Sequence, residues 1–423
     1  SNNDTPFSDR FKWGAGVYYL KSTAGFDPAH LKVAPQGFSS ILDILQVDDP
    51  LGDAPQDLVG LLPAGNTPLE EGGLQVAFSG VLGTKSSSAF FQGTWYFNEQ
   101  WDLTVGGRLQ RERRYLTKSE TRLGNLTGGA GSVSQPFDPD GSLTLLRFDL
   151  GSETATNFSP KLVLSYHPNE SSMLYASYST GFKSGTYNVV NIYTPPQYIV
   201  PEKVTTYELG AKSDLFGGIL RANGALFWNE IDDLQSGFVS LLSGGAVQFY
   251  TAGSARTRGI ELDFTLLPLP DLNPGLALTG NAAYVDSEYL NLTQGRGFDE
   301  TTGIYEANGQ YSGNEIVRSP TTSGSLGAVQ AIELGSGTLE LGADIYYNSG
   351  FYYDAKNTVE EDAYQVINGR ISYLYTPWDL RVTAFGQNLA DRRYHVQQFQ
   401  NDFGIIKTLA APRIIGLRVN WAF

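Results

Sequence analysis

Apolar and polar residues alternate with a period of two in many segments of this sequence. In the C-terminal segment, every second residue is apolar: Ile415, Leu417, Val419, Trp421 and Phe423. The residues between them are mostly small or polar, and the same alternation occurs at 101–109, 220–229, 260–266 and 339–348. Because successive side chains of a β-strand point to opposite faces, each segment is predicted to be a strand with one apolar face.

The alternating segments divide the chain into fourteen predicted strands. They lie at 10–22, 84–97, 101–118, 157–167, 171–185, 203–215, 219–233, 247–268, 276–288, 319–333, 338–349, 363–376, 380–390 and 411–423. Long links at 23–83, 119–156, 186–202, 234–246, 289–318, 350–362 and 391–410 alternate with short links such as 98–100, 168–170, 216–218, 335–337 and 377–379.

This alternation of long and short links separates two all-β architectures. A soluble sandwich also has strands with one apolar face, but nothing in a sandwich requires long and short links to alternate strictly. An outer-membrane barrel has tight turns at its periplasmic rim and long loops outside the cell. The sequence therefore predicts a transmembrane antiparallel β-barrel. Trp95, Trp101 and Trp378 beside short links agree with an aromatic belt at one interface.

Composition narrows the function. The chain has no Cys, which excludes a disulfide framework, Cys-based zinc sites and thiol catalysis. A formal net charge of -15 argues against nucleic acid as a partner. The chain begins at Ser1 without Met or a signal-like segment, so we expect it to be a piece of a longer protein.

Five segments carry recognisable motifs in a fixed order. They are 179–185 (STGFKSG), 201–212 (PEK with YELGAK), 258–261 (RGIE), 388–394 (NLADRRY) and 412–423 (PR with a terminal Phe). Together they resemble landmarks of the TonB-dependent outer-membrane receptors, in particular the iron-complex branch. The resemblance covers about residues 84 to 423, and 11–19 is similar to an earlier strand of such a barrel.

The resemblance implies a specific architecture and activity. Residues 1–423 would be the C-terminal portion of a 22-stranded barrel, with about fourteen strands present and the N-terminal plug and first strands absent; closure at fourteen strands is the alternative. The expected function is ligand-gated uptake of a scarce solute, siderophore-iron first, otherwise cobalamin, haem or oligosaccharide. The implied partners are the plug, the TonB-ExbB-ExbD complex, outer-membrane lipid and lipopolysaccharide. The competing functions are a passive porin and a structural or adhesive surface barrel.

Charged residues on the strands are expected to face a watery interior, because a mid-membrane Lys or Arg facing lipid costs about 2–4 kcal/mol. Arg258 and Glu261 are expected there for the same reason. The candidates are Glu208, Lys212, Glu261, Asp263, Glu340, Asp344, Arg370 and Arg418. In the family that the motifs resemble, such residues hold the plug; the alternative is that they only solvate the interior.

Aromatic residues in the long links are the candidate ligand-binding residues. They are Tyr187, Tyr193, Tyr198, Phe249, Tyr250, Tyr305, Tyr311, Phe351, Tyr352 and Tyr353. Aromatic faces suit planar chelates, sugars and hydrophobic vitamins, whereas the alternative is that they pack the loops together. The link 23–83, with a possible short helix at 41–45, is a candidate lid or partner contact.

Nothing in the sequence indicates catalysis. His30, His167 and His395 are far apart, and neither an H-E-x-x-H nor a G-x-S-x-G pattern occurs. Residues 138–141 (DPDG) are interpreted as a turn rather than a calcium loop. We therefore expect no enzyme activity, no cofactor and no metal site.

Overall fold

The computed structural model describes residues 6–8, 10–33, 74–124, 143–189, 195–239, 247–299, 301–402 and 404–422. The strands are β1 (Pro6–Ser8), β2 (Phe11–Val33), β3 (Leu74–Tyr96), β4 (Trp101–Gly124), β5 (Leu143–Arg147), β6 (Ser152–Asn169), β7 (Ser172–Lys183), β8 (Thr186–Tyr187), β9 (Tyr198–Ile199), β10 (Glu202–Leu215), β11 (Leu220–Asp232), β12 (Gln235–Val239), β13 (Val247–Thr251), β14 (Ser254–Leu266), β15 (Leu276–Asn291), β16 (Gly295–Phe298), β17 (Tyr305–Gly309), β18 (Thr322–Leu334), β19 (Gly337–Tyr352), β20 (Glu360–Tyr375), β21 (Leu380–Gln387), β22 (His395–Asn401), β23 (Gly404–Leu409) and β24 (Ile414–Trp421). Two short 3₁₀ helices are η1 (Phe216–Gly218) and η2 (Thr376–Trp378).

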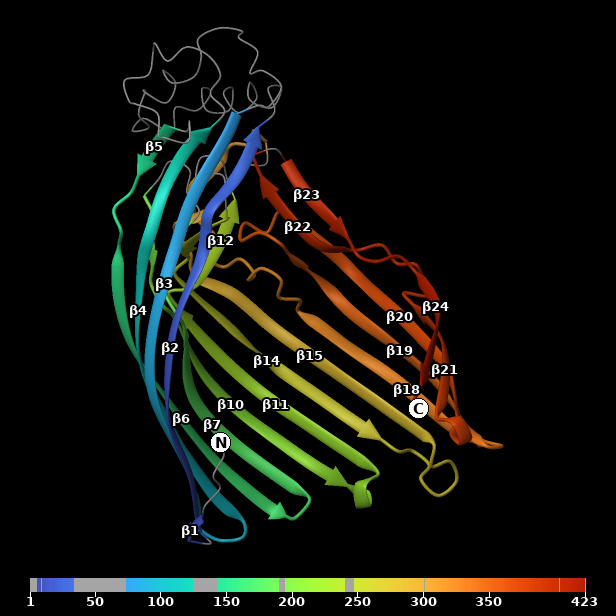
Figure 1. Ribbon diagram of the computed structural model, residues 1–423. Helices are drawn as coiled ribbons and strands as arrows, with labels where there is room; N and C mark the ends of the chain where they lie inside the picture. The colour runs from blue at the N-terminus through green and yellow to red at the C-terminus, as the bar shows by residue number, and fades with distance from the viewer. Residues whose placement is uncertain are drawn as a thin grey trace.

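One large antiparallel sheet dominates the fold. It has 16 strands in the order β1-β2-β3-β4-β6-β7-β10-β11-β14-β15-β18-β19-β20-β21-β24, with β5 attached to β4. Without the short strands β1 and β5, fourteen strands remain, and the fourteen predicted strands correspond to them. The sheet curves around a hollow, and short turns join its strands at one rim (Figure 1). The predicted all-β architecture is confirmed.

At the opposite rim, the long links contain small ribbons of their own. The pairs β8-β9, β12-β13, β16-β17 and β22-β23 each form a two-stranded sheet separate from the wall. These ribbons give the loops hydrogen-bonded backbone that does not depend on the wall.

The apolar strand faces point away from the hollow. On β24, Ile415 is 74% exposed, Leu417 74% and Val419 62%, so within the described residues no second sheet covers this side. Trp95 and Trp101 flank the turn at 97–100, and all three predicted belt tryptophans, including Trp378, are exposed. The alternation therefore separates an outward apolar face from a concave polar face, as a barrel wall in a membrane requires.

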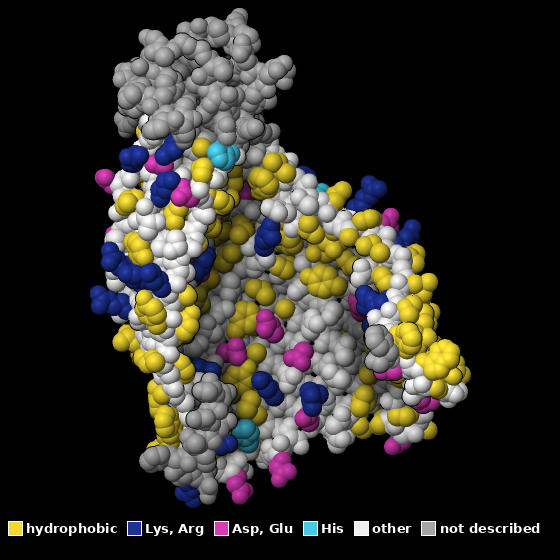
Figure 2. All heavy atoms as spheres, in the orientation of Figure 1, with side chains coloured by type: hydrophobic (Ala, Val, Ile, Leu, Met, Phe, Trp, Pro, Cys, Tyr) yellow, Lys and Arg dark blue, Asp and Glu magenta, His cyan; other side chains and the backbone are white. Residues whose placement is uncertain are grey.

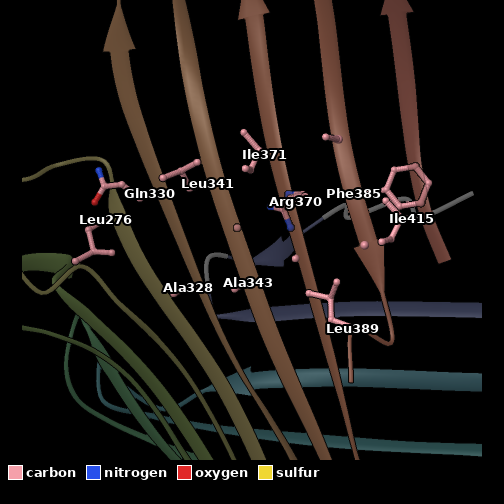
Figure 3. Close-up of a pocket in the computed structure, with 14 residues that line it drawn as sticks. Leu276, Ala328, Gln330, Leu341, Ala343, Arg370, Ile371, Phe385, Leu389 and Ile415 are labelled. Carbon is pink, nitrogen blue, oxygen red and sulfur yellow. The ribbon is translucent and has the colours of Figure 1, made fainter. Parts of the chain in front are cut away.

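A groove of about 630 Å³ runs along this outward face across β18 to β24. Figure 3 shows Leu276, Leu341, Ile371, Leu389 and Ile415 around it. Small residues, Ala328 and Ala343 among them, form its floor, so the groove is apolar like the rest of the outward face.

The predicted link 23–83 is wrong in extent. β2 continues to Val33 and β3 begins at Leu74, and the two pair from Thr23 with Gly83 to Val33 with Leu74. Residues 74–83 alternate, with Leu74, Val76, Phe78 and Leu82 on one face, whereas their partners at 23–33 include Asp27-Pro28 and show no period-two signal. Likewise β4 runs to Gly124, and the predicted strand 247–268 is broken at Gly253, where φ is +88°. The predicted short helix at 41–45 and the turn at 138–141 lie outside the described residues.

The end of β21 is held by one asparagine of the NLADRRY motif. Asn388 has a left-handed φ of 48°. Its side-chain Oδ1 accepts from the Arg392 N–H at 2.8 Å, and its Nδ2 donates to the carbonyls of Arg392 and Ala411 at 2.9 and 3.2 Å. Its own N–H donates to Asn368 Oδ1 at 3.0 Å. Asn388 therefore joins the end of β21 to the segment that enters β24.

Replacing Asn388 by Ala is expected to lower the free energy of unfolding by about 1–3 kcal/mol, because buried backbone groups lose their partners. Asn388→Asp keeps the acceptor for Arg392 but replaces the Nδ2 donors with a carboxylate oxygen that faces two carbonyl oxygens, so its loss of stability should be at least as large. Denaturant unfolding of the folded receptor in detergent measures both. Equal stability of Asn388→Ala and the parent would show that these bonds do not hold the strand end.

Candidate functional site

Charged and polar side chains gather on the concave face of the wall (Figure 2). Strand register places eight predicted residues on this face, opposite the apolar one. They are Glu208, Lys212, Glu261, Asp263, Glu340, Asp344, Arg370 and Arg418.

The first concave cluster is built around Tyr175 of β7. The Tyr175 hydroxyl donates to Glu208 Oε1 at 2.6 Å, and the Lys212 ammonium lies 5.9 Å from the centre of the Tyr175 ring. A Cβ at Gly210 would lie 2.3 Å from Tyr175 Cζ. Glycine at this position of the YELG motif therefore leaves room for the ring that carries the bond to Glu208. Tyr175 was not predicted, since a tyrosine gives no charge signal.

Next to this cluster is a polar cavity of about 340 Å³. Asn223 donates to Asp263 Oδ1 at 2.8 Å, which satisfies one carboxylate oxygen. Glu261 is exposed and lines the same cavity, together with Tyr175 and Lys212. The wall here presents carboxylates, an ammonium and a phenol toward the hollow, a surface suited to polar protein or water rather than lipid.

A second concave cluster lies on β19 to β21. Arg370 Nε donates to Glu340 Oε1 at 3.1 Å, and Arg381 Nη1 lies 3.8 Å from Glu340 Oε2. Asn368 Nδ2 donates to Asp344 Oδ2 at 2.8 Å. On β24, the Arg418 guanidinium lies 5.5 Å from the centre of the Phe385 ring. The charges of this cluster are thus largely paired within the wall.

Arg258 does not face the hollow, contrary to the sequence-based expectation. It shares its face of β14 with Ile260 and Leu262, and its Nε donates to Asp286 Oδ2 at 2.8 Å. Glu261, three residues on, is on the other face. Arg258 lies at the loop end of the strand beyond the apolar residues, where an ion pair can face outward without meeting hydrocarbon. Its neighbour Arg256 is paired with Glu288 in the same way.

Two predicted loop aromatics, Tyr250 and Tyr305, meet Phe238 in one cluster around Arg296. Phe238 stacks on Tyr305 with ring centres 5.4 Å apart, and it meets Tyr250 edge-on at 5.7 Å. The Arg296 guanidinium lies 4.9 Å from the centre of the Phe238 ring and 5.1 Å from that of Tyr250. Arg296 Nη1 also donates to the Tyr305 hydroxyl at 3.1 Å. Neither Phe238 nor Arg296 was predicted.

Tyr311 is held beneath this cluster. Its hydroxyl donates to Glu306 Oε2 at 3.1 Å, and Lys356 Nζ lies 3.1 Å from the same oxygen. Burial, with the nearby Glu306 carboxylate acting in the same direction, raises the pKa of the Tyr311 phenol. The phenol therefore stays protonated through neutral pH and remains a donor to Glu306.

A second loop cluster contains Tyr187 and Tyr198, whose ring centres are 5.1 Å apart. Burial raises the pKa of both phenols. Next to it, Asn188 bonds to the backbone of Phe249 twice, accepting from its N–H and donating to its carbonyl, both at 2.8 Å. This side-chain bridge ties the loop after β7 to the ribbon β12-β13.

The remaining predicted aromatics lie at the loop end of β19. Phe351 and Tyr353 meet edge-on with ring centres 5.0 Å apart, and the Arg318 guanidinium lies 5.3 Å from the centre of the Tyr353 ring. The Tyr353 hydroxyl donates to the His395 carbonyl at 2.7 Å. Tyr352 lines an acidic cavity of about 280 Å³ with Glu360 and Glu361. Tyr193 lies outside the described residues.

The predicted aromatics differ in accessibility. Tyr187, Tyr250 and Tyr311 are each only 6% exposed, whereas Phe249 is 40% exposed. The buried three favour the alternative in which aromatics pack the loops together. Six predicted aromatics keep part of their surface open: Tyr198, Phe249, Tyr305, Phe351, Tyr352 and Tyr353. The last five of these are named the mouth aromatics below.

Two histidines pair with carboxylates at opposite ends of the wall. His167 Nε2 lies 2.9 Å from Asp102 Oδ2, and His395 Nδ1 lies 2.9 Å from Glu361 Oε2. Within the residues that the structure describes, no group of three or more His, Asp or Glu side chains is arranged to hold a metal ion. No helix in that same part of the chain has the length and apolarity to cross a membrane.

Comparison with known proteins shows which family the chain belongs to. The model of the TonB-dependent receptor-like β-barrel matches residues 2–389, most of the chain. The chain belongs to this family. Its members are outer-membrane proteins of Gram-negative bacteria, which agrees with the outward apolar face and the polar hollow described above.

Two curated relatives are named as receptors. The pesticin receptor of Yersinia pestis is 21% identical over 349 residues, which cover 82% of this chain and 45% of the relative. The probable TonB-dependent siderophore receptor PiuA of Acinetobacter baumannii is 24% identical over 272 residues, which cover 62% of this chain and 33% of the relative. The chain thus spans less than half of either protein.

Solved structures show the same fold. The ferric yersiniabactin uptake receptor FyuA of Yersinia pestis superposes with a TM-score of 0.63 at 18% identity, over 81% of this chain and 46% of that chain. The siderophore receptor PiuA of Acinetobacter baumannii gives 0.65 at 16% identity, over 97% and 52%. In this TonB-dependent receptor barrel, Gly210 of the YELG motif leaves room for the Tyr175 ring. Asn388 of the NLADRRY motif holds the end of β21.

Replacing Gly210 by Ala is expected to displace Tyr175 and lower the free energy of unfolding by about 1–3 kcal/mol. Gly181→Ala is the matched control, because a Cβ at Gly181 on the same face of β7 meets nothing within 4 Å. Denaturant unfolding measures both variants. In a Tyr175→Ala background the Gly210→Ala loss should vanish; an undiminished loss would mean that the ring is not its cause.

Proposed function

We propose that the whole protein is a ligand-gated outer-membrane receptor that takes up a siderophore-iron complex with energy from the TonB system. The family match over residues 2–389 carries the proposal. It is supported by the names of relatives, which include a siderophore receptor and a ferric yersiniabactin uptake receptor. Cobalamin, haem and oligosaccharide are the alternative solutes.

We further propose that residues 1–423 are the C-terminal portion of a 22-stranded barrel, completed by upstream strands and filled by an N-terminal plug. In the described residues, no ladder joins β24 to β1 or β2, which leaves both edges open to further strands. The concave carboxylates and cations, Glu208, Lys212, Glu261 and Asp263 among them, would hold the plug through ion pairs and hydrogen bonds. Catalysis has no part in this function.

The mouth aromatics are proposed to contact the ligand. They lie on loops above a rigid wall, the arrangement that carries recognition in many scaffolds. Loop contacts such as Asn188 with Phe249 hold the backbone in place, so the rings are presented with little ordering cost on binding. Iron chelates built on planar aromatic groups would stack on such faces.

Growth and uptake separate this function from its rivals. A strain lacking the gene is expected to grow less under iron limitation and to lose uptake of a radiolabelled iron complex, and deletion of tonB should have the same effect. A passive porin would transport without TonB. A structural or adhesive barrel would leave uptake unchanged in the deletion strain.

Phe249→Ala and Phe351→Ala are each expected to weaken ligand binding by about tenfold, as for an aromatic anchor. Phe158→Ala is the matched control, because Phe158 is exposed on the outward apolar face of β6. Quenching of intrinsic fluorescence by titrated iron complex gives the Kd of each variant. If all three variants bind alike, the mouth aromatics do not form the ligand site.

A further inference from the structure

The hairpin β22-β23 extends from the wall beyond the ends of β21 and β24 (Figure 1). All six residues of β23 (Gly404–Leu409) are exposed, so in the described part of the chain no other element covers this strand. β22 carries the contacts with the wall, and they are made with β20. The hairpin therefore leans on the wall through one of its two strands.

β20 lacks a neighbouring strand at the point where the hairpin meets it. β21 pairs with β20 only over Gly369–Tyr375, so within the described residues the stretch 360–368 has no strand beside it on that side. A side chain of the hairpin supplies a partner there, since Gln398 Nε2 donates to the Glu360 carbonyl at 3.1 Å. The attachment thus depends on side chains rather than on a backbone ladder.

The same contact contains a buried carboxylate. Glu361 is 7% exposed and Gln398 is 3% exposed. Glu361 Oε2 accepts from Gln398 Nε2 at 3.0 Å and lies 2.9 Å from His395 Nδ1. The Tyr353 hydroxyl donates to the His395 carbonyl at 2.7 Å, which holds the backbone that carries the imidazole. We call Glu361, His395 and Gln398 the hairpin latch.

Acidic groups surround Glu361. Three further carboxylates line the cavity of about 280 Å³ beside it: Glu315, Glu360 and Asp362. A buried carboxylate in such surroundings is costly unless it is paired. The cations of the neighbouring segments are Arg318, Arg392 and Lys407. Within the described residues none of these cations forms an ion pair with Glu361, and His395 is the basic side chain that lies at ion-pair distance.

The hairpin latch is incompletely satisfied while His395 is neutral. A neutral imidazole gives Glu361 an ordinary hydrogen bond, and Gln398 Oε1 is buried without a hydrogen-bond partner in the described part of the chain. Buried polar networks that are partly satisfied are weak points of a fold. Protonation of His395 makes the bond to Glu361 charge-assisted, which is about twice as strong as a neutral bond. Histidine is the side chain that gains such a charge between about pH 5 and pH 8.

We propose that the hairpin latch is operated by a proton: it holds β22-β23 against β20 when His395 is protonated and releases the hairpin as the pH rises. The charge-assisted bond exists only in the latched hairpin, so acid adds stability to the latched form, and this stability is lost toward alkaline pH. Burial raises the pKa of the Tyr353 phenol, which therefore remains a donor across this range. Release would free that hydroxyl, so the latch couples external acidity to one of the mouth aromatics.

The experiment measures the distance between two spin labels in the full-length receptor in detergent, without solute. The chain has no Cys, so Ile405→Cys on β23 and Lys203→Cys on β10 provide the label sites, and both positions are exposed. Double electron–electron resonance gives the populations of latched and released hairpin. The ratio of released to latched hairpin is expected to rise about tenfold between about pH 5.5 and pH 8.

Three variants separate the latch from a general effect of pH. His395→Asn keeps a neutral donor near the Nδ1 position, and Glu361→Gln keeps a neutral acceptor, so both should lose the pH response. His167→Asn is the matched control, because His167 pairs with Asp102 at the opposite rim, and it should respond as the parent does. An equal ratio in the parent at both pH values, a parent-like response in His395→Asn or Glu361→Gln, or a lost response in His167→Asn would each overturn the proposal. Unchanged Tm values of the variants show that the wall is folded.

Solute binding is measured separately, because the coupling to the mouth rests on the proposed function whereas the latch itself does not. The Kd of the parent for the iron complex should increase between about pH 5.5 and pH 8 more than the Kd of His395→Asn does. Equal changes in the two would overturn the coupling to the mouth. Loss of the latch signal without a change in uptake would leave the proposed receptor function intact.

Discussion

The backbone of a membrane wall has to satisfy its own hydrogen bonds, and the rest of this structure depends on that constraint. Hydrocarbon offers no partner to a peptide N–H or C=O, so each strand must pair along its length with its neighbours. The ladders that join β2 through to β24 do this across most of the apolar band. Where a ladder ends, as at β21, a side chain takes over, and Asn388 supplies the donors and acceptor that the turn requires.

Once the strands are paired, side-chain chemistry is divided by position. Within the band, apolar residues face outward, and carboxylates and cations face the hollow, where Tyr175, Asn223 and Arg370 give them partners. Above the band, charge returns to the outward face. Arg258 can face outward because it lies above the hydrocarbon, near the loop end of its strand. There, an outward ion pair with Asp286 costs little free energy.

The same division explains what sequence reasoning predicted and what it missed. Within the band, lipid imposes a two-residue period, so strands such as 339–348 and 414–421 were visible from the alternation alone. Above it, no face must be apolar, and segment 23–33 carried no such signal, although its partner 74–83 does alternate. The concave charges were found because ionised residues are conspicuous. Tyr175, Arg296 and Phe238 were missed, because their roles come from neighbours on other strands or loops.

The loops pack through contacts of their own that are separate from the ladders of the wall. The ribbons β12-β13 and β16-β17 have their own small core, in which Tyr250, Tyr289 and Tyr311 are buried. Asn188 joins that ribbon system to the loop after β7, and Asn357 exchanges two backbone bonds with Glu315. These contacts involve no residue of the apolar band, so loop sequence can vary without disturbing the ladders. Which rings the packed loops leave open is therefore a property of the assembled surface rather than of any motif.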